Sequence, residues 1–475
     1  MPNYSDLRDF IDKVSKAGEL RTFSGAKSDL EVGGITEVAW EFAPVPLCLF
    51  QDIKGCGSEY RVLTNLYSSR YRESLLYGID PQLSIRDGMR AWKERIKDVT
   101  PLPPRLVTDG AVLSRSSEGD SIDLSRLPFI RWHEHDGGGY LCATSVTIRD
   151  PRTNYLNVGS YRFQYRSPTT MVCHIGSGHN GDVLRKLYWE QGKPCPITIS
   201  LGQDPSLIVA AGTDLRFGTS EYDYAGWLRG EPVNIIDGPA TGVPMPADAE
   251  IVIEAELLPP GDGMADEGPF GESSGYYGGG VHQAPIVKVL AVHERPDPIV
   301  LGLPPVKGRM RTKLGSRAVQ IWKELEDLGV PNVMAVNYAW GMTIISIRQM
   351  YPGHPMRAAH GALGGTAGYH GRLVVVVDED VNIYDPDEVL WAISTRCDPE
   401  TSIDIARRIW SYRIDPRLSP DKRARGDLTG SAAIIDACRP FHWKDQFPPV
   451  TGISSELRDD VLARWSDQIG GVTDR

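Results

Sequence analysis

The chain has 475 residues, of which 41% are hydrophobic and 24% are charged, as in ordinary globular proteins. A chain of this length predicts about three domains, and it can bury a core without the help of disulfide bonds. Lys and Arg number 51 against 62 Asp and Glu, so the formal net charge is −11. This acidic balance argues against a general binder of the nucleic-acid backbone.

The sequence predicts neither a membrane segment nor a secretory signal. No stretch approaches about 18 uncharged apolar residues, and residues 1–10 are polar and acidic. The seven cysteines are scattered and form no CxxC pair. This usage predicts a cytoplasmic protein with free thiols rather than a zinc ribbon or a disulfide framework.

The first region predicts a small α/β unit. Apolar residues recur at helical spacing between Leu7 and Val14, with Ser5 as the expected cap and Gly18 as the expected stop. Short mixed segments follow, and the proline-rich stretch 101–104 forms a stiff break. We therefore place the first region at residues 1–105.

Residues 106–304 predict a β-barrel or sandwich, because short β-rich segments alternate with turns rich in Gly, Pro and Asp. Two helices are expected within this region, at Asp182–Gln191 and Tyr222–Arg229. The predicted strands are Ala143–Ile148, Pro196–Leu201, Leu207–Ala211, Glu250–Leu257 and Ile286–Val292.

Residues 305–475 predict α/β layers. Apolar residues from Ala318 to Leu328 follow a helical period that ends at Gly329, and the acids at 378–380 are expected to be a solvated strand end. The other expected elements are the strands Asn332–Asn337, Met342–Ser346 and Leu373–Val377, a turn region His360–His370, and the helices Pro386–Ser394 and Ser454–Ile469. The terminal helix is expected to dock on a second subunit.

The most informative motif is Glu267-Gly-Pro-Phe-Gly-Glu272. Glycine permits positive φ and proline fixes φ, so such a loop can aim two carboxylates at one point. Two carboxylates in different surroundings can divide into one ionised group and one proton donor. The alternative is a surface turn with two solvated acids.

A second group of candidate residues combines oxygen and nitrogen ligands with a guanidinium. Asn157, His179 and Glu221 supply an amide, an imidazole and a carboxylate, which suit a divalent ion such as manganese. Arg162 could clamp a carboxylate, although a structural ion pair is the alternative. His174 is a second candidate histidine near His179, and Glu221 could equally be a first-turn acid of a helix.

Together these segments resemble the UbiD family of prenylated-FMN-dependent decarboxylases, in its aromatic and heteroaromatic acid branch. The resemblance covers most of the chain and several motifs occur in the family's order. The segments that carry it are Glu267–Glu272, Asn157–Arg162, Ser220–Tyr224, Leu373–Tyr384, Val389–Ala392 and Ile434–Ala437.

The resemblance implies a fold of a small N-terminal α/β region, a split β-barrel that holds the flavin, and a C-terminal α/β oligomerisation domain. It also implies roles: Arg162, Glu267 and Glu272 surround the reactive flavin carbon, and Glu272 is the proton donor. Manganese would be held by Asn157, His179 and Glu221, and potassium by backbone carbonyls near Ala210, Ala211 and Thr213. The implied cofactor-binding residues are Asn157, Val158, Tyr161, Arg162, His179, Ala211, Thr213 and Glu221.

The implied reaction is the reversible decarboxylation of an aromatic acid, and it needs a cofactor because no side chain is an electron sink. An indole- or pyrrole-carboxylate is slightly favoured, since no secure partner for ring hydroxyls is evident beyond Arg348 and Lys307. A hydroxybenzoate such as vanillate or protocatechuate is the alternative. A flavin prenyltransferase would supply the cofactor to a homodimer or larger homo-oligomer. The competing classes are an FMN reductase and a non-catalytic assembly partner.

Overall fold

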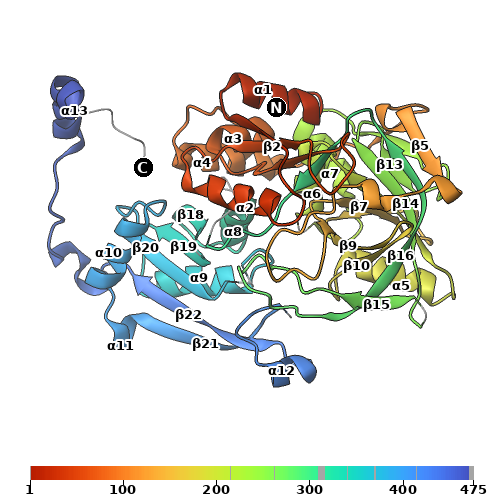
Figure 1. Cartoon of the computed structure of the whole chain (residues 1–475). Helices are drawn as coiled ribbons and strands as arrows, with labels where there is room; N and C mark the ends of the chain where they lie inside the picture. Colours follow the sequence, from red (N-terminus) through yellow and green to blue (C-terminus); the bar gives the residue numbers. More distant parts are fainter. Residues whose placement is uncertain are drawn as a thin grey trace. The chain divides into compact units, whose positions relative to one another are not determined.

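The computed structural model describes residues 2–213, 215–261, 263–308, 316–339, 341–368, 371–412 and 414–469. Two compact units emerge: residues 1–316 with 411–428 form unit 1, and residues 317–410 with 429–475 form unit 2. The architecture is a mixed α/β one (Figure 1). Among the described helices, none combines the length and apolar character needed to cross a membrane.

Unit 1 begins with a four-stranded sheet in the order β1-β2-β3-β17, surrounded by helices (Figure 1). The strand β17 returns from far along the chain and pairs in parallel with β3. The strands are β1 Leu20–Ser24, β2 Leu47–Gln51, β3 Arg61–Thr64 and β17 Ile299–Gly302, and the helices are α1 Leu7–Lys16, α2 Glu31–Val38, α3 Arg70–Tyr77 and α4 Ile85–Arg95.

The helix α1 forms as its pattern predicts, with Leu7, Phe10 and Val14 buried. Its cap differs from the prediction by one residue, because the Asp6 carboxylate accepts the hydrogen bond from the Asp9 amide. Ser5 instead donates its own amide to the Asp9 carboxylate at 2.9 Å.

The main body of unit 1 is a ten-stranded, largely antiparallel sheet. Its principal path runs β6-β9-β10-β16-β14-β11-β7-β8, with β15 and β5 paired to β16, and this path does not close among the described strands. The strands are β5 Arg115–Glu118, β6 Tyr140–Leu141, β7 Ser145–Arg149, β8 Leu156–Gly159, β9 Arg162–Ser167, β10 Thr170–His174, β11 Cys195–Leu201, β14 Ile251–Leu257, β15 Met264–Glu267 and β16 His282–Glu294.

Smaller elements complete unit 1. A three-stranded sheet has the order β13-β12-β4, and the helices α5 and α7 cover the two predicted helical stretches. The bounds are β4 Arg105–Leu106, β12 Asn234–Asp237, β13 Pro244–Pro246, α5 Asn180–Trp189, α6 Pro205–Ala211, α7 Glu221–Arg229 and α12 Pro420–Ala424.

One predicted strand is wrong: residues 207–211 lie in the helix α6. The apolar run is too short for its period to decide between helix and strand. Its flanks decide instead, since Asp204 caps the helix by accepting from the Ser206 amide at 2.7 Å and Pro205 occupies the first turn.

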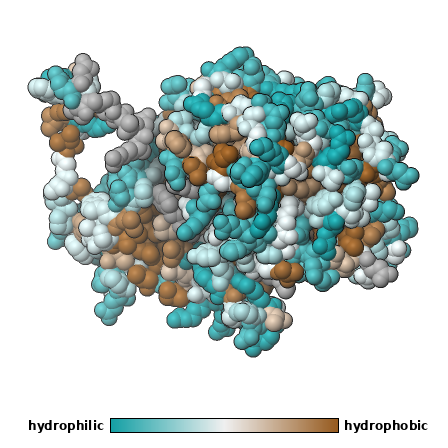
Figure 2. Space-filling model, viewed as in Figure 1, coloured by the Kyte–Doolittle hydropathy of each residue, from teal (hydrophilic) through white to brown (hydrophobic). Residues whose placement is uncertain are grey.

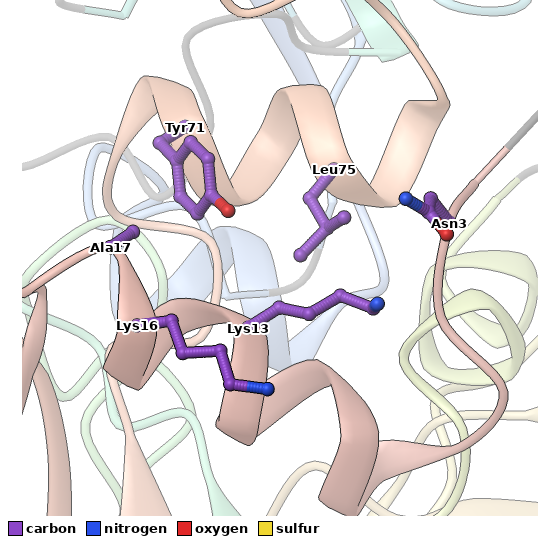
Figure 3. Close-up of a pocket in the computed structure, with 6 residues that line it drawn as sticks. All are labelled: Asn3, Lys13, Lys16, Ala17, Tyr71 and Leu75. Carbon is purple, nitrogen blue, oxygen red and sulfur yellow. The ribbon is translucent and has the colours of Figure 1, made fainter.

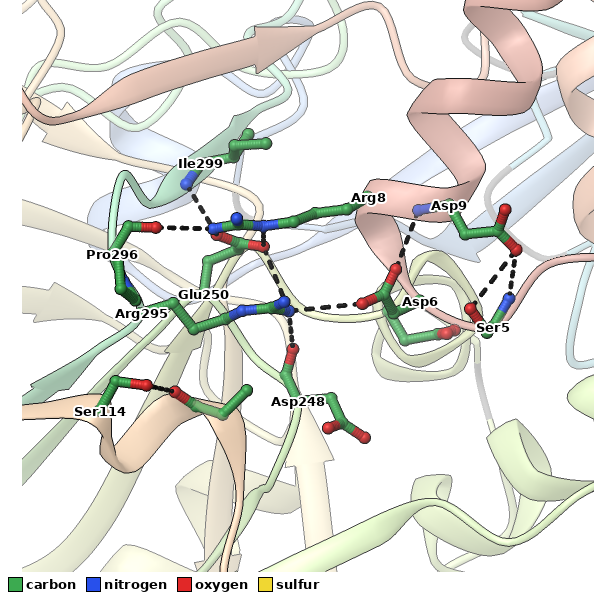
Figure 4. A network of polar contacts seen from close by, with 12 residues as sticks. Ser5, Asp6, Arg8, Asp9, Ser114, Asp248, Glu250, Arg295, Pro296 and Ile299 are labelled. Carbon is green, nitrogen blue, oxygen red and sulfur yellow. Dashed lines mark hydrogen bonds and ion pairs between the residues drawn. The ribbon is translucent and has the colours of Figure 1, made fainter.

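A shared core and a buried carboxylate bind the N-terminal elements to the main sheet. Phe50 of β2 and Phe163 of β9 belong to one apolar cluster. Glu250, fully buried before β14, accepts two hydrogen bonds of 2.7 Å from the Arg8 guanidinium (Figure 4). Its carboxylate also accepts from the Ile299 amide at 3.2 Å and lies 3.5 Å from the Arg295 guanidinium.

Unit 2 is built on a five-stranded sheet in the order β18-β19-β20-β22-β21. The inner strands β19, β20 and β22 are parallel, as in α/β layers, and α9 packs on all three. The bounds are β18 Val333–Ala339, β19 Met342–Ile347, β20 Leu373–Asp378, β21 Ile403–Trp410, β22 Thr429–Ala437, α8 Ser316–Asp327, α9 His354–Gly364, α10 Pro386–Arg396, α11 Pro399–Ser402 and α13 Ser455–Ile469.

Three expectations for this region are wrong. The stretch from His360 is not a turn at its start, because α9 extends to Gly364; Tyr369 and His370 lie outside the described residues. The acids of 378–380 are not all solvated, since Arg396 binds both Asp378 and Asp380 and its side chain is only 1% exposed. Leu328, expected on the apolar face of the helix, lies beyond the end of α8 at Asp327 and is 56% exposed.

Replacing Glu250 with alanine should lower the free energy of unfolding by about 2–3 kcal/mol, because the partly buried guanidinium groups of Arg8 and Arg295 lose their shared acceptor. The expected loss of stability is smaller than that for a fully buried ion pair, because the Arg8 side chain is 34% exposed. The midpoint of urea denaturation, followed by circular dichroism, measures the effect. Asp12→Ala, which removes an exposed pair with Lys16 on the same helix, should leave the midpoint unchanged. An unchanged midpoint for Glu250→Ala would contradict this account.

Candidate active site

The Glu267–Glu272 motif lies in a loop that connects β15 and β16. Gly268 has a φ of +94°, and a Cβ at this position would come within 2.4 Å of the Gly280 carbonyl oxygen. Both the backbone angle and the close approach therefore require glycine. The two ends of the loop are joined by the β15–β16 pairing, in which Glu267 is opposite His282.

Arg162 brings the two glutamates together. Its Nε and Nη2 donate to the two carboxylate oxygens of Glu267 at 2.8 and 3.1 Å, and its Nη1 donates to Glu272 at 2.8 Å. The side chains of Arg162, Glu267 and Glu272 are 9%, 0% and 10% exposed. The alternative of a turn with two solvated acids is therefore wrong, and the predicted triad forms one cluster.

The opposite charges in this cluster stabilise one another. Burial disfavours the charged form of Arg162, but the hydrogen bonds and charges of Glu267 and Glu272 outweigh it, so the pKa of the guanidinium is raised. The Phe270 ring lies beside it, with the Arg162 Cζ 4.9 Å from the ring centroid. One cation thus pairs with two carboxylates at a site with little exposure to solvent.

A network that the sequence did not predict holds the carboxylate loop in place. The buried Asp136 accepts hydrogen bonds from the amides of Trp132 and His133 at 3.1 and 3.0 Å. Its other oxygen accepts from the Gly271 amide at 3.4 Å and from the Tyr277 hydroxyl at 3.2 Å. Burial, together with the charge of Asp136, raises the pKa of Tyr277 to about 12.

Two further contacts fix the start of the loop. The Gln164 side chain donates to the Gly137 carbonyl at 3.0 Å and accepts from the Gly268 amide at 3.1 Å. The Tyr140 hydroxyl donates to the Pro269 carbonyl at 3.2 Å. The only sequence signal for this contact surface is the Gly-Gly-Gly stretch 137–139, where the backbone approaches the loop closely.

The segment 411–428, which belongs to unit 1, covers the other end of the loop. A Cβ at Gly278 would lie 2.2 Å from the Ile414 carbonyl oxygen, so the two backbones are in direct contact. This segment, which is distant in sequence, thus borders the candidate site. No sequence motif predicted the contact.

Of the three predicted manganese ligands, two are in contact. Glu221, the first residue of α7, accepts hydrogen bonds from the Asn157 amide group at 3.0 Å and from the Val158 backbone at 2.6 Å. The Asn157 Oδ1 is buried and has no hydrogen-bond partner. Burial raises the pKa of Glu221 to about 7, although its two donors partly oppose this. An orphaned oxygen beside a buried carboxylate fits a cation.

His179 is the third predicted ligand. It precedes α5 and is exposed, and an added Cβ at Gly176 would lie 2.7 Å from its Cδ2. Within the described part of the chain, no hydrogen bond joins its ring to Asn157 or Glu221. His174, the second candidate histidine, lies beside Glu267 and His282.

Three other predicted cofactor residues are Tyr161, Ala211 and Thr213. The hydroxyl of the half-buried Tyr161 lies close to Gly181 and Gly159, where an added Cβ would approach it to 2.3 and 2.4 Å. Ala211 ends α6, and the Thr213 hydroxyl donates to the Val209 carbonyl at 2.8 Å. The last carbonyls of a helix carry partial negative charge, so this helix end could hold a potassium ion.

A groove elsewhere on unit 1 is separate from these residues. It has a volume of about 340 Å³ and is lined by Asn3, Lys13, Lys16, Ala17, Tyr71 and Leu75 (Figure 3). Its lysines pair with acids of the same helix, since Lys16 lies 2.6 Å from Asp12 and Lys13 lies 3.6 Å from Asp9. The groove therefore offers little net positive charge to an anion.

Comparison with known proteins identifies the family. Residues 105–308 match the 3-octaprenyl-4-hydroxybenzoate carboxy-lyase Rift-related domain, and residues 315–437 match the C-terminal domain of the same carboxy-lyase. The chain belongs to the UbiD family. It is accordingly a carboxy-lyase, as the sequence resemblance predicted.

Similar proteins span nearly the whole chain. A phenolic acid decarboxylase of Streptomyces sp. (strain D7) is 31% identical over 98% of each chain. The UbiD-class enzyme HmfF of Pelotomaculum thermopropionicum, solved with FMN, is 27% identical with a TM-score of 0.84, covering 97% of this chain and 100% of that one. An evolved dimeric form of HmfF, solved with prFMN, is 26% identical with a TM-score of 0.80, covering 97% and 99%.

Replacing Asp136 with asparagine should loosen the carboxylate loop, because an amide group cannot accept from all four donors. We expect hydrogen exchange of the peptide 268–281 to accelerate about tenfold, as read by mass spectrometry. Asp266→Asn is the matched control, because Asp266 is exposed on β15 at the edge of the same loop. Equal exchange in the two variants would show that Asp136 does not hold the loop.

The raised pKa of Glu221 predicts a pH-dependent stability of the metal-free protein. The folded state binds the proton more tightly than the unfolded state between about pH 4.5 and pH 7, so stability from this group is lost as the pH rises through that window. Relative to Glu221→Gln, the wild type should lose roughly 2–3 kcal/mol between pH 5 and pH 8.

Thermal unfolding in the presence of a chelator tests this dependence. Added Mn²⁺ should restore the stability of the wild type at pH 8 but not that of Glu221→Gln. Glu190→Gln, at an exposed site beyond α5, is the control and should follow the wild type. Parallel pH profiles for the wild type and Glu221→Gln would contradict the assignment.

Proposed function

We propose that this carboxy-lyase removes CO2 from an aromatic or heteroaromatic carboxylic acid with the help of prenylated FMN. The observation that carries the proposal is the buried cluster of Arg162, Glu267 and Glu272. Similarity to HmfF, which was solved with FMN, and to its evolved form with prFMN supports the cofactor.

Prenylated FMN would supply the electron sink that a carboxylate on an sp² carbon requires, since no side chain can accept that electron pair. The residues of the chain do the rest. The bond to the carboxyl carbon breaks, CO2 leaves, and the electron pair of that bond, which the cofactor would accept, forms the new C–H bond when the ring carbon receives a proton. A donor held close to that carbon accelerates the last step.

The hydrogen bonds of the cluster support different roles for the two glutamates. Glu267 receives two donors from Arg162 and is fully buried, so it acts as the ionised partner that orients the guanidinium. Glu272 receives one donor from Arg162 and keeps 10% of its side chain exposed. Because Glu272 loses fewer hydrogen bonds on taking up a proton, it is the group that delivers the proton to the ring carbon.

The phosphate end of the cofactor would lie near the second cluster. Asn157 and Glu221, with His179, would hold a manganese ion that offsets the phosphate charge in an acidic protein. Val158 and Tyr161 would border the cofactor, and carbonyls near Ala210, Ala211 and Thr213 would hold a potassium ion. The unpaired Asn157 Oδ1 supports this arrangement.

The substrate class is proposed from two observations that favour different candidates. The 31% identical relative is a phenolic acid decarboxylase, which favours a hydroxybenzoate such as vanillate or protocatechuate. Arg348, considered as a partner for ring hydroxyls, is bound to Glu379 at 3.1 Å within unit 2, and Lys307 is exposed. The lack of an assigned hydroxyl partner favours an indole- or pyrrole-carboxylate.

We further propose the three functional regions 1–105, 106–304 and 305–475, with the ten-stranded sheet as a split barrel around the flavin. The last region would form a homodimer or larger homo-oligomer. Apolar residues gather on unit 2 near α10 and β22 (Figure 2). The exposed apolar side chains of its helix α10 and edge strand β21 are Leu390, Trp391, Ile403, Ile405 and Trp410.

The proposed setting is the cytoplasm, where a flavin prenyltransferase would supply the cofactor. None of the seven cysteines forms a disulfide bond in the structure, which suits a reducing compartment. Co-expression with a flavin prenyltransferase, followed by native mass spectrometry and elemental analysis, tests the cofactor and the metals together. A well-folded protein that binds neither flavin nor metal would favour the assembly-partner alternative.

Glu272→Gln should lower CO2 release from the best aromatic acid by at least about a thousandfold, because the amide cannot donate a proton to carbon. Flavin occupancy, read from the visible spectrum, should stay at the wild-type level. Glu134→Gln, an exposed acid close to the loop in unit 1, is the control and should keep full activity. Normal turnover by Glu272→Gln would overturn the assignment of the proton donor.

A further inference from the structure

Two histidines lie beside the Arg162–Glu267 ion pair because of strand register. His174 is opposite Arg162 in the β9–β10 pairing, and His282 is opposite Glu267 in the β15–β16 pairing. The two strand pairs meet where β10 pairs with β16. The fold therefore gathers four polar side chains from four strands, although the residues lie up to 120 positions apart in sequence.

The distances within this group define one hydrogen bond between the two rings and two longer contacts with Glu267. His174 Nδ1 and His282 Nε2 are 2.6 Å apart, and the two rings are nearly perpendicular, at 84°. His282 Nε2 is also 3.3 Å from the Glu267 carboxylate, on the oxygen that accepts from Arg162 Nη2. His174 Nδ1 is 3.9 Å from the same oxygen, which is beyond hydrogen-bond range.

The position of one proton follows from these distances. A contact of 2.6 Å between two ring nitrogens needs one hydrogen between them. If His174 carried it, the lone pair of His282 Nε2 would face an ionised carboxylate. If His282 carries it on Nε2, that hydrogen points to His174, and the positive end of the N–H dipole, rather than a lone pair, lies 3.3 Å from the Glu267 oxygen.

The surroundings of His174 favour its uncharged form. Burial lowers the pKa of His174 to about 2, and the neighbouring charges of Arg162, His282, His179 and Arg185 act in the same direction. Glu267 is the acidic group that faces it. An uncharged His174 with a free lone pair on Nδ1 is an acceptor for His282.

We propose that His282 is a positioning residue whose Nε2–H faces the Glu267 carboxylate at 3.3 Å, and that His174 fixes the required tautomer of His282. This inference rests on the proposed function for its catalytic meaning. The partial positive charge of this N–H adds to the two hydrogen bonds from Arg162 and keeps the Glu267 carboxylate correctly oriented, so that Glu272 can deliver the catalytic proton.

A metal ion is the alternative occupant of this group, since the three ligand atoms of His174, Glu267 and His282 lie within 4.8 Å of one another. The geometry favours the hydrogen bond. Two nitrogens bound at about 2.1 Å to one tetrahedral zinc ion would lie roughly 3.4 Å apart, whereas here they are 2.6 Å apart. Arg162 also already occupies both oxygens of Glu267.

The first test needs neither cofactor nor substrate. The full chain is labelled with ¹⁵N-histidine, and the signals of His174 and His282 are assigned from single variants. We expect His282 as the Nε2–H tautomer, and an uncharged His174 whose shifts do not change between pH 5 and pH 8. An ordinary titration of His174, or an Nδ1–H tautomer of His282, would overturn the proposal. Stoichiometric Zn²⁺ binding that is lost in His282→Gln would overturn it as well.

The second test uses the enzyme loaded with cofactor and compares matched variants. His282→Gln places a donor near the position of Nε2, whereas His282→Leu removes it at similar size. We expect kcat to fall about tenfold in His282→Leu with KM unchanged, and to recover in His282→Gln. His174→Asn, which retains an acceptor near Nδ1, should likewise exceed His174→Leu.

The outcomes separate the two proposals. Equal losses in the glutamine and leucine variants would assign His282 a merely structural role and overturn the inference. A wild-type protein without decarboxylase activity would contradict the proposed function, while the ¹⁵N spectra would still decide the tautomers.

Discussion

The structure of the candidate site depends on one arginine that is held between two carboxylates out of water. Removing such charges from water is costly unless each is paired and hydrogen-bonded. Arg162 meets this requirement with three hydrogen bonds, and the Phe270 ring covers it. The tight loop, its contacts to Asp136 and the neighbouring histidines all limit the freedom of these charged groups.

The rigidity of the carboxylate loop comes from parts of the chain that are distant in sequence. Asp136 and Gln164 hold its backbone, and the segment 411–428 covers Gly278. A reaction that needs a proton at one ring carbon requires such fixed geometry, because small displacements of a donor lower the rate strongly. Contacts with the rest of unit 1, and not the loop sequence alone, therefore fix the position of the loop.

Buried carboxylates also organise the protein away from the site. Glu250 ties the N-terminal helix to the main sheet, and Asp378 lies in a network with Arg396 within unit 2. Glu254 is fully buried and its carboxylate lies 2.8 Å from the His293 ring. In each case an acid that is unremarkable in sequence is bound by a partner from another segment of the chain, and such contacts allow an acidic chain to bury carboxylates.

Local sequence determined much of this protein. The period of α1, the strands of the main sheet and the helices α5, α7 and α10 follow from apolar spacing and turn residues, and the Glu267–Glu272 motif with Asn157 and Arg162 indicated the family. Short runs without a clear period failed: residues 207–211 became a helix because of their caps. Tertiary structure alone decided which acids are buried, placed Asp136 and Ile414 against the loop, and brought His282 to Glu267. These features depend on strand register and on contacts between distant segments, and no local pattern of residues encodes either.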